Sequence, residues 1–316
     1  MSMALRTRAL VALASVRPRR AIADLTPDEI RRNRKTVLPH HFPFGAVFGK
    51  VPASVAISAA TATTRDGGVA VRVYRPRSGQ APRPLVLFLH GGGWVQGNVL
   101  SYDPLCAQVA DRVGAVVVSV DYRLAPDNPF PAAVHDAYDA LLWAVGAADE
   151  LGVDPDRVAV FGDSAGGNLA AVITLMARDL DGPRLAFQAL LYPATDATLS
   201  SPSIDRNADA PILTRSNVRA FLALYRGPAE TTDPLLSPLH APSHAGLPPA
   251  LIQTAELDPL RDDGARYAEA LTAAGVRVHY TEYAAVPHGF ASYPGAVRCG
   301  KQSLAELTDA LREALS

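Results

Sequence analysis

The segment RVAVFGDSAGGNLAAVITLMA, residues 157–177, is the most informative stretch of this chain. Residues 157–161 form a short apolar run with β-branched valines, which predicts a buried strand, and residues 165–177 predict a helix. Ser164 lies between these two elements, and Gly162 and Gly166 flank it two residues away on either side. This G-x-S-x-G spacing is typical of a sharp strand-to-helix turn that presents a serine at its apex.

A serine at such a turn suits nucleophilic chemistry, provided that a base removes its proton and that it stands clear of its neighbours. The small residues around Ser164 supply the clearance. The predicted helix begins at Ala165, and its first backbone N–H groups carry partial positive charge. These groups could therefore stabilise the oxyanion that forms when the serine attacks a carbonyl group.

A second glycine-rich turn, HGGGW at residues 90–94, follows a predicted strand at 85–89. Consecutive glycines allow the backbone to approach a substrate oxygen closely, and loops of this type donate hydrogen bonds to oxyanions in esterases and lipases. We therefore expect Gly92, Gly93 and Ala165 to form an oxyanion hole. Either motif alone also fits a simple tight turn, but both motifs at strand ends favour the catalytic interpretation.

The general base is expected late in the chain, because this type of turn is followed by the acid and then by the histidine of its triad. Two histidines qualify by position, His279 and His288. His279 lies within an alternating run that predicts a strand, so we interpret it as structural. His288 lies just beyond that strand in the motif VPHGF, where a loop could bring its imidazole to Ser164. His288 is therefore the predicted base.

The acid of the triad is expected at Asp258. The apolar run at 250–255 predicts a strand that leads directly into the sequence ELDPL, residues 256–260. Asp258 then lies in the loop at the carboxyl end of the strand, where open α/β sheets place their functional sites. Its role would be to orient His288 and to stabilise the imidazolium. Glu256 is the alternative, but it lies within the predicted strand.

Together these motifs resemble those of the hormone-sensitive-lipase-like carboxylesterases, a group of α/β-hydrolases. The chain contains HGGGW, GDSAGG, DPL and HGF in that order, together with DYRLAP at 121–126 and FPAA at 130–133. The resemblance covers about residues 20–316. It departs from the family at Pro287, immediately before the histidine, and at Asn128, where relatives often have histidine.

The resemblance implies an α/β-hydrolase fold, with a mostly parallel central sheet flanked by helices and a helical cap. It also implies Ser164 as nucleophile, Asp258 and His288 as its partners, and Gly92, Gly93 and Ala165 as oxyanion donors. The activity implied is hydrolysis of short- to medium-chain acyl esters without a cofactor. An amidase or deacetylase of a specific metabolite would use the same residues, and a receptor would be expected to have lost the triad.

Residues 51–194 and 228–316 are predicted to form the catalytic core, and residues 1–50 and 195–227 the cap. Within the cap, helices are expected at 4–16, at 27–35 and at 216–225. The second of these begins with a capping box, because Thr26 precedes Pro27 and Glu29 stands three residues after it. Alternation of strands and helices favours a mostly parallel sheet. The remaining strands are expected at 69–74, 115–120, 186–192 and 276–283, and further helices at 132–147 and 261–274.

Two aromatic residues are candidates for the substrate pocket. Trp94 directly follows the oxyanion loop and Phe42 lies in the aromatic stretch HHFPF, although each could equally brace its own loop. Asp163 stands beside the nucleophile, but its side chain should leave the turn in another direction and hold neighbouring loops by hydrogen bonds. His90 is interpreted as structural.

Composition excludes several classes of function. The 316 residues are 48% hydrophobic and carry a net charge of −1, so nothing favours nucleic acid as a partner. The two cysteines predict neither a disulfide framework nor a metal site, and no metal is expected.

No apolar run is long enough for a membrane span. The N-terminal apolar stretch lacks a persuasive cleavage site, so a cytoplasmic location is expected. The strand at 276–283 could form an exposed edge that pairs two subunits into a homodimer.

Overall fold

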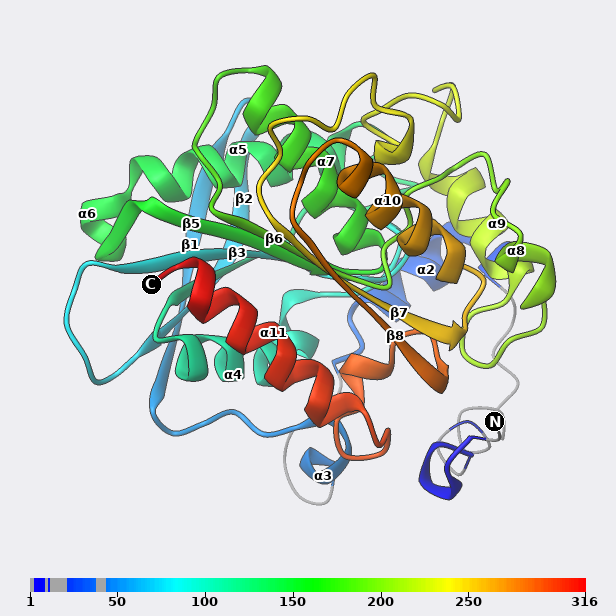
Figure 1. Ribbon diagram of the computed structural model, residues 1–316, viewed down its shortest axis with the longest axis horizontal. Helices are drawn as coiled ribbons and strands as arrows, with labels where there is room; N and C mark the ends of the chain where they lie inside the picture. Colours follow the sequence, from blue (N-terminus) through cyan, green and yellow to red (C-terminus); the bar gives the residue numbers. More distant parts are fainter. Residues whose placement is uncertain (1–2, 9–10, 12–21, 38–43) are drawn as a thin grey trace.

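A single eight-stranded sheet forms the centre of the molecule (Figure 1). The structure is a computed structural model that describes residues 3–8, 11, 22–37 and 44–316. The strand order is β1-β2-β4-β3-β5-β6-β7-β8. The pairs β1–β2 and β2–β4 are antiparallel, and every other neighbouring pair is parallel. The bounds of the strands are β1 Val55–Thr64, β2 Gly67–Pro76, β3 Arg83–Leu89, β4 Val116–Val120, β5 Val153–Asp163, β6 Phe187–Leu191, β7 Ala250–Leu257 and β8 Val278–Pro287.

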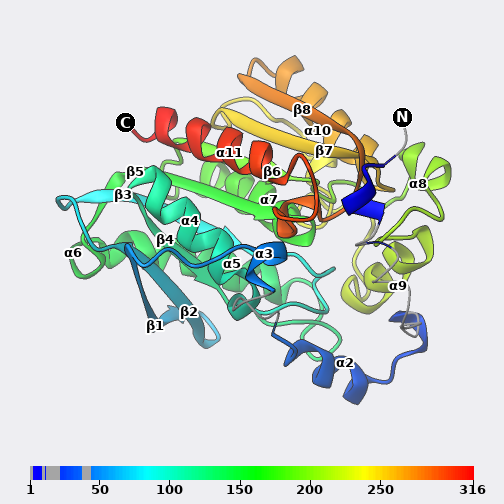
Figure 2. The ribbon, with the colours of Figure 1, turned by 90° about the horizontal axis from the view of Figure 1, so that it is seen from below.

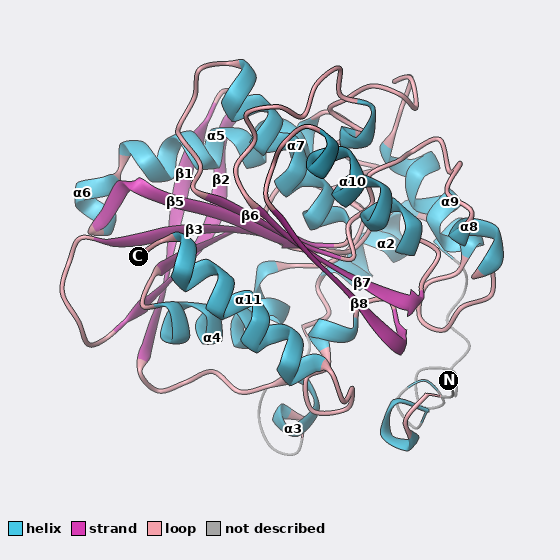
Figure 3. Cartoon of the chain, in the orientation of Figure 1, coloured by secondary structure: helices cyan, strands magenta, loops and turns pink. Residues whose placement is uncertain are grey.

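Helices cover both faces of this sheet, as Figures 2 and 3 show. On one face lie α4 (Asp103–Val113) and α11 (Gly300–Ala314). On the other lie α5 (Ala132–Gly146), α7 (Ala165–Asp179) and α10 (Arg261–Ala273). The shorter elements are η1 (Ile22–Asp24), α2 (Pro27–Arg34), α3 (Gly45–Phe48), η2 (Val99–Tyr102), α6 (Ala148–Leu151), α8 (Ser203–Arg206), α9 (Arg215–Tyr225), η3 (Pro238–His240) and η4 (Phe290–Ser292).

The central strands are apolar on both faces because both faces are covered. In β3, Leu85, Leu87 and Leu89 belong to the core beneath α5 and α7, whereas Val86 and Phe88 belong to the core beneath α4 and α11. All five side chains are fully buried. Such continuous apolar runs are typical of parallel strands enclosed by helices. The predicted α/β architecture with a mostly parallel sheet is confirmed.

The sequence patterns located seven of the eight strands, and the structure adds β1. This strand is rich in alanine, serine and threonine and is only partly buried, so it lacks a clear apolar alternation. It pairs with β2 through a tight hairpin in which Thr64 faces Gly67. The strand β8 lies at the other edge of the sheet, as expected, and pairing of two subunits through it stays a prediction.

The N-terminal part of the chain reaches the oxyanion loop through α2. Thr26 caps this helix with the predicted capping box, in which the side chains of Thr26 and Glu29 each bond the other residue's backbone N–H. Arg34 donates from Nε to the carbonyl oxygen of Val95, at 2.9 Å, and forms an ion pair with Asp127. The helix predicted at 4–16 falls largely outside the described residues, which include a helical turn at residues 5–8.

The connection between β6 and β7 holds α8, α9 and η3, and in Figure 1 α8 and α9 lie beyond the carboxyl ends of the central strands. The helix predicted at 216–225 is present as α9. No helix within the described ranges is both long and apolar enough to span a bilayer.

The close packing of α7 against β3 leads to a stability prediction. A Cβ atom added at Gly166 would lie 2.0 Å from the carbonyl oxygen of Leu89. Because this oxygen belongs to the backbone, a side-chain rotation cannot relieve the clash. We expect Gly166→Ala to lower the free energy of unfolding by about 2 kcal/mol or more, measured by urea denaturation. The control is Gly146→Ala at the end of α5, where an added Cβ meets nothing within 4 Å. Equal effects of the two substitutions would contradict this packing account.

Candidate active site

Ser164 occupies the turn between β5 and α7 in a backbone conformation that few residues adopt. Its φ is 55° and its ψ is −119°. The turn is held by close packing, because a Cβ atom at Gly162 would lie 2.2 Å from the carbonyl oxygen of Gly166. Strained residues persist only where the surrounding structure determines them, and they gather at functional sites. The predicted turn therefore forms as expected, with Ser164 at its apex.

The structure brings Ser164, His288 and Asp258 into one chain of hydrogen bonds. His288 Nε2 lies 2.9 Å from Ser164 Oγ, and His288 Nδ1 lies 2.6 Å from Asp258 Oδ2. The Asp258 side chain is fully buried and that of His288 is 10% exposed, so little water competes for these bonds. The three residues come from three different strand ends, those of β5, β7 and β8.

The two alternatives considered from the sequence bind elsewhere. Glu256 Oε2 accepts a hydrogen bond from the backbone N–H of Ala285, at 2.6 Å. His279 projects from the edge strand, with 65% of its side chain exposed, and its Nε2 lies 2.7 Å from Glu306 Oε1. Neither residue contacts Ser164 or lines its pocket. Asp258 and His288 are thus the acid and the base that the geometry favours.

The oxyanion loop places backbone donors beside Ser164. Gly92 has a φ of 126°, in the region that favours glycine over residues with a side chain. Its carbonyl oxygen accepts hydrogen bonds from the N–H groups of Val95 and Gln96. Gly92, Gly93 and Ala165 all line the same cavity as Ser164. Within the described part of the chain, none of their N–H groups donates a backbone hydrogen bond outside its own helix or strand. These donors remain available to a developing negative charge.

Asp163 holds the oxyanion loop against the serine turn. Its Oδ1 accepts a hydrogen bond from the backbone N–H of Gly91, at 2.7 Å, and its Oδ2 accepts one from the Tyr102 hydroxyl, at 3.0 Å. Burial of the carboxyl group raises the pKa of Asp163 to about 6. Asp163 therefore joins neighbouring loops, as expected from its place beside Ser164. No pattern in the sequence pointed to its partner Tyr102.

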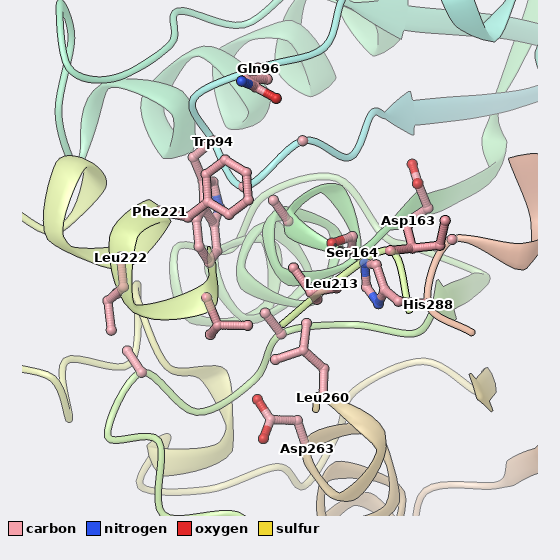
Figure 4. Close-up of a pocket in the computed structure, with 18 of the residues that line it drawn as sticks. Trp94, Gln96, Asp163, Ser164, Leu213, Phe221, Leu222, Leu260, Asp263 and His288 are labelled. Atoms are coloured by element: carbon pink, nitrogen blue, oxygen red, sulfur yellow. Dashed lines mark hydrogen bonds between the residues drawn. The ribbon is translucent and has the colours of Figure 1, made fainter. Parts of the chain in front are cut away.

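A cavity of about 280 Å³ opens in front of Ser164. Figure 4 shows Ser164 and His288 side by side, with Trp94, Leu213, Phe221 and Leu222 also drawn along the pocket. Trp94 thus lines the cavity, and its ring is stacked on that of Tyr225 with centroids 4.6 Å apart. Phe42, the other residue expected here, lies outside the described residues.

Most of the apolar lining was not singled out from the sequence. It comes from the connection between β6 and β7, and from the loop at Leu260. The helical spacing of Val218, Phe221 and Leu222 in α9 was a usable signal, because these residues share one face of a helix. Their lining partners in the same connection are Ala194, Ala197, Leu199, Ile212, Leu213 and Leu236. In the described ranges, no cluster of three or more histidine, cysteine or carboxylate side chains could hold a metal ion.

Comparisons with known proteins agree with this geometry. A family model described as the alpha/beta hydrolase fold matches residues 86–292. The carboxylesterase NlhH of Mycobacterium tuberculosis is 49% identical over 251 residues, which cover 77% of this chain and 79% of that protein. The ethyl acetate hydrolase of Pseudomonas putida is 38% identical over 276 residues, covering 85% and 86% of the two chains.

Solved structures give the same result for the whole chain. A hyperthermophilic esterase from the archaeon Pyrobaculum calidifontis is 35% identical and superposes with a TM-score of 0.88, covering 100% of both chains. A bacterial heroin esterase is 34% identical, with a TM-score of 0.89 over 100% of this chain and 98% of that one. The resemblance found in the four sequence motifs is confirmed, and the chain belongs to the hormone-sensitive-lipase-like carboxylesterases of the α/β-hydrolase fold.

Proposed function

We propose that this protein is a serine carboxylesterase that hydrolyses short- to medium-chain acyl esters through an acyl-enzyme intermediate. The observation that carries the proposal is the continuous chain of hydrogen bonds from Asp258 through His288 to Ser164, with distances of 2.6 Å and 2.9 Å. A base within hydrogen-bond reach of the nucleophile, itself oriented by a third group, is the arrangement that activates a serine.

The reaction begins when Ser164 Oγ attacks the ester carbonyl carbon and His288 Nε2 accepts its proton. Asp258 holds the Nδ1–H of the ring and stabilises the imidazolium that results. The negative charge that develops on the carbonyl oxygen is met by the N–H groups of Gly92, Gly93 and Ala165. Donors fixed in advance in this way act where charge appears in the transition state, and each contributes about 3 kcal/mol in comparable sites.

The intermediate then collapses, and the carbon–oxygen bond to the alcohol breaks. The imidazolium of His288 gives its proton to the departing alcohol, and Ser164 is left carrying the acyl group. Water attacks this acyl-enzyme with His288 again acting as base, which releases the carboxylic acid and restores the serine. The cycle uses only side chains and backbone groups of the protein, together with water.

The size and lining of the cavity support a small apolar acyl group. Its volume of about 280 Å³ lies near the lower end of the range for small-molecule sites. Trp94, Leu213, Phe221 and Leu222 give it an apolar wall. The curated relatives include an ethyl acetate hydrolase, whose name specifies a short-chain ester. Acyl esters of low molecular weight are therefore the proposed substrates and small-molecule partners.

We further propose that residues 1–50 and 195–227 act as a cap on a core formed by residues 51–194 and 228–316. Eight residues of the segment 195–227 line the cavity, and α2 is bonded to the oxyanion loop through Arg34. A cap of this kind would exclude water from the reacting ester and would limit the length of the acyl chain.

The proposal is tested with p-nitrophenyl esters from acetate to palmitate. We expect kcat/KM to peak at short or medium chains, and Ser164→Ala to lower it by roughly 10⁵-fold because the nucleophile is lost. Ser316→Ala, an exposed serine just beyond α11, is the control and should retain full activity. Persistent hydrolysis by Ser164→Ala would contradict the proposal. Preference for p-nitroacetanilide over the esters would instead indicate an amidase that uses the same residues.

The pocket wall predicts a change in chain-length preference. Leu213 is 8% exposed and lines the same cavity as Ser164, so Leu213→Ala should make room for a longer acyl group. We expect the ratio of kcat/KM for hexanoate to that for butyrate to rise by about tenfold. Leu180→Ala, at a position 60% exposed just after α7, provides the control and should leave the ratio unchanged. An unaltered ratio in Leu213→Ala would show that the acyl chain lies elsewhere.

Burial of Asp163 predicts a dependence of stability on pH. Its folded-state pKa of about 6 lies above the value of 3.8 for a free carboxyl group, so the folded protein holds the proton more tightly than the unfolded chain does. The wild type should therefore lose stability relative to Asp163→Asn as the pH rises from about 4 to about 6. The difference in unfolding free energy between the two proteins should change by a few kcal/mol over this range and then remain constant. Urea denaturation at several pH values measures this difference, and a difference that does not vary with pH would contradict the assignment.

A further inference from the structure

The short helix α8 is bonded directly to the loop that carries Asp258. Asn207, which caps the end of α8, donates from its side-chain nitrogen Nδ2 to the carbonyl oxygens of Glu256, at 3.0 Å, and Asp258, at 2.9 Å. These two carbonyl groups stand on either side of Leu257, the last residue of β7. In Figure 1, α8 lies beside the carboxyl end of β7.

A second residue of α8 continues this attachment. The Ser203 hydroxyl, which is fully buried, donates to the carbonyl oxygen of Pro259, at 2.7 Å, and accepts from the backbone N–H of Asp262, at 3.0 Å. The backbone N–H of Ser203 donates in turn to Asp262 Oδ2, at 2.9 Å. Four residues of the stretch 256–262 are thus hydrogen-bonded to α8 or to its cap. They are Glu256, Asp258, Pro259 and Asp262.

The acid loop is short. Only Asp258, Pro259 and Leu260 separate β7 from α10. Asp258 Oδ1 accepts from the backbone N–H of Leu260, at 2.9 Å, which leaves Oδ2 directed at His288. A tilt of this loop would move the carboxylate away from the imidazole. Because reacting groups must be placed closely, a displacement of about 1 Å can lower a rate by about a hundredfold.

We propose that Asn207 is a positioning residue. The hydrogen bonds from its side-chain amide to the acid loop hold the Asp258 carboxylate in line with His288, and they couple the segment 195–227 to the reacting groups. The inference rests on the proposed function of the triad. It gives α8 a role distinct from the pocket lining, because neither Ser203 nor Asn207 borders the cavity. Movement of the segment would be transmitted to the triad through these hydrogen bonds.

The variants Asn207→Ala and Asn207→Asp test this inference. The first removes both donors, and the second replaces them by carboxylate oxygens of similar shape that cannot donate. We expect kcat for p-nitrophenyl butyrate to fall by about tenfold or more with little change in KM. The acidic limb of kcat/KM against pH should move to lower pH, because a displaced Asp258 stabilises the imidazolium less well.

Asn217→Ala is the matched control. Asn217 also belongs to the segment 195–227, but its side chain makes no hydrogen bond within the described part of the chain, so its kcat and pH profile should equal those of the wild type. Ser203→Ala removes the neighbouring attachment and should shift the profile in the same direction as Asn207→Ala. Thermal unfolding of each variant establishes that the protein being assayed is folded. Should both Asn207 variants fail to fold, Ser203→Ala supplies the comparison.

A spectroscopic readout separates this inference from the proposed function. The short hydrogen bond between His288 and Asp258 should give a proton resonance far downfield of the amide region, and this signal does not depend on turnover. It should move upfield or broaden in Asn207→Ala and stay unchanged in Asn217→Ala. An unaltered signal and pH profile in folded Asn207→Ala would overturn the inference while wild-type hydrolysis remained intact. Absence of ester hydrolysis in the wild type would instead defeat the proposed function.

Discussion

The start of α7 packs directly against the ends of β3 and β5, and the geometry of the site follows from this close contact. The glycines on either side of Ser164 allow backbone atoms to approach so closely that an added Cβ at Gly166 would come within 2.0 Å of the Leu89 carbonyl oxygen. This contact forces Ser164 into its strained conformation and places its side chain clear of the sheet. It also places Ala165 in the lining of the same cavity. The predicted nucleophile and one predicted oxyanion donor thus follow from one turn.

The parallel sheet then assembles residues that lie far apart in the sequence. Gly92 and Gly93 follow β3, Ser164 follows β5, Asp258 follows β7 and His288 follows β8. Because parallel strands share one carboxyl edge, these groups meet there, as sites in open α/β sheets commonly do. The connection between β6 and β7 crosses the same edge and supplies the apolar wall. Asn207, which caps the end of its helix α8, also bonds to the acid loop, so one segment both lines the cavity and contacts the loop that carries Asp258.

The three residues that the structure joins by hydrogen bonds, Ser164, His288 and Asp258, could be singled out from the sequence, because the proposed chemistry restricts both their type and their place. A serine between glycines, an aspartate at a strand end and a histidine in the last loop each follow a strand with a clear apolar pattern. Contacts between distant polar residues left no such pattern. Tyr102 and Asn207 bond to Asp163 and to the acid loop only because the fold brings them there. The strand β1 was missed because its small polar residues do not alternate with large apolar ones.

Covalent labelling tests directly whether Ser164 is the nucleophile and His288 its base. A fluorophosphonate transfers a phosphonyl group to an activated serine and releases fluoride, so peptide mass spectrometry identifies the residue that attacked. We expect stoichiometric labelling of the peptide containing Ser164 in the wild type. In His288→Ala we expect no labelling on the same timescale. Labelling of another residue, or hydrolysis that continues after the reagent has saturated Ser164, would contradict these two assignments.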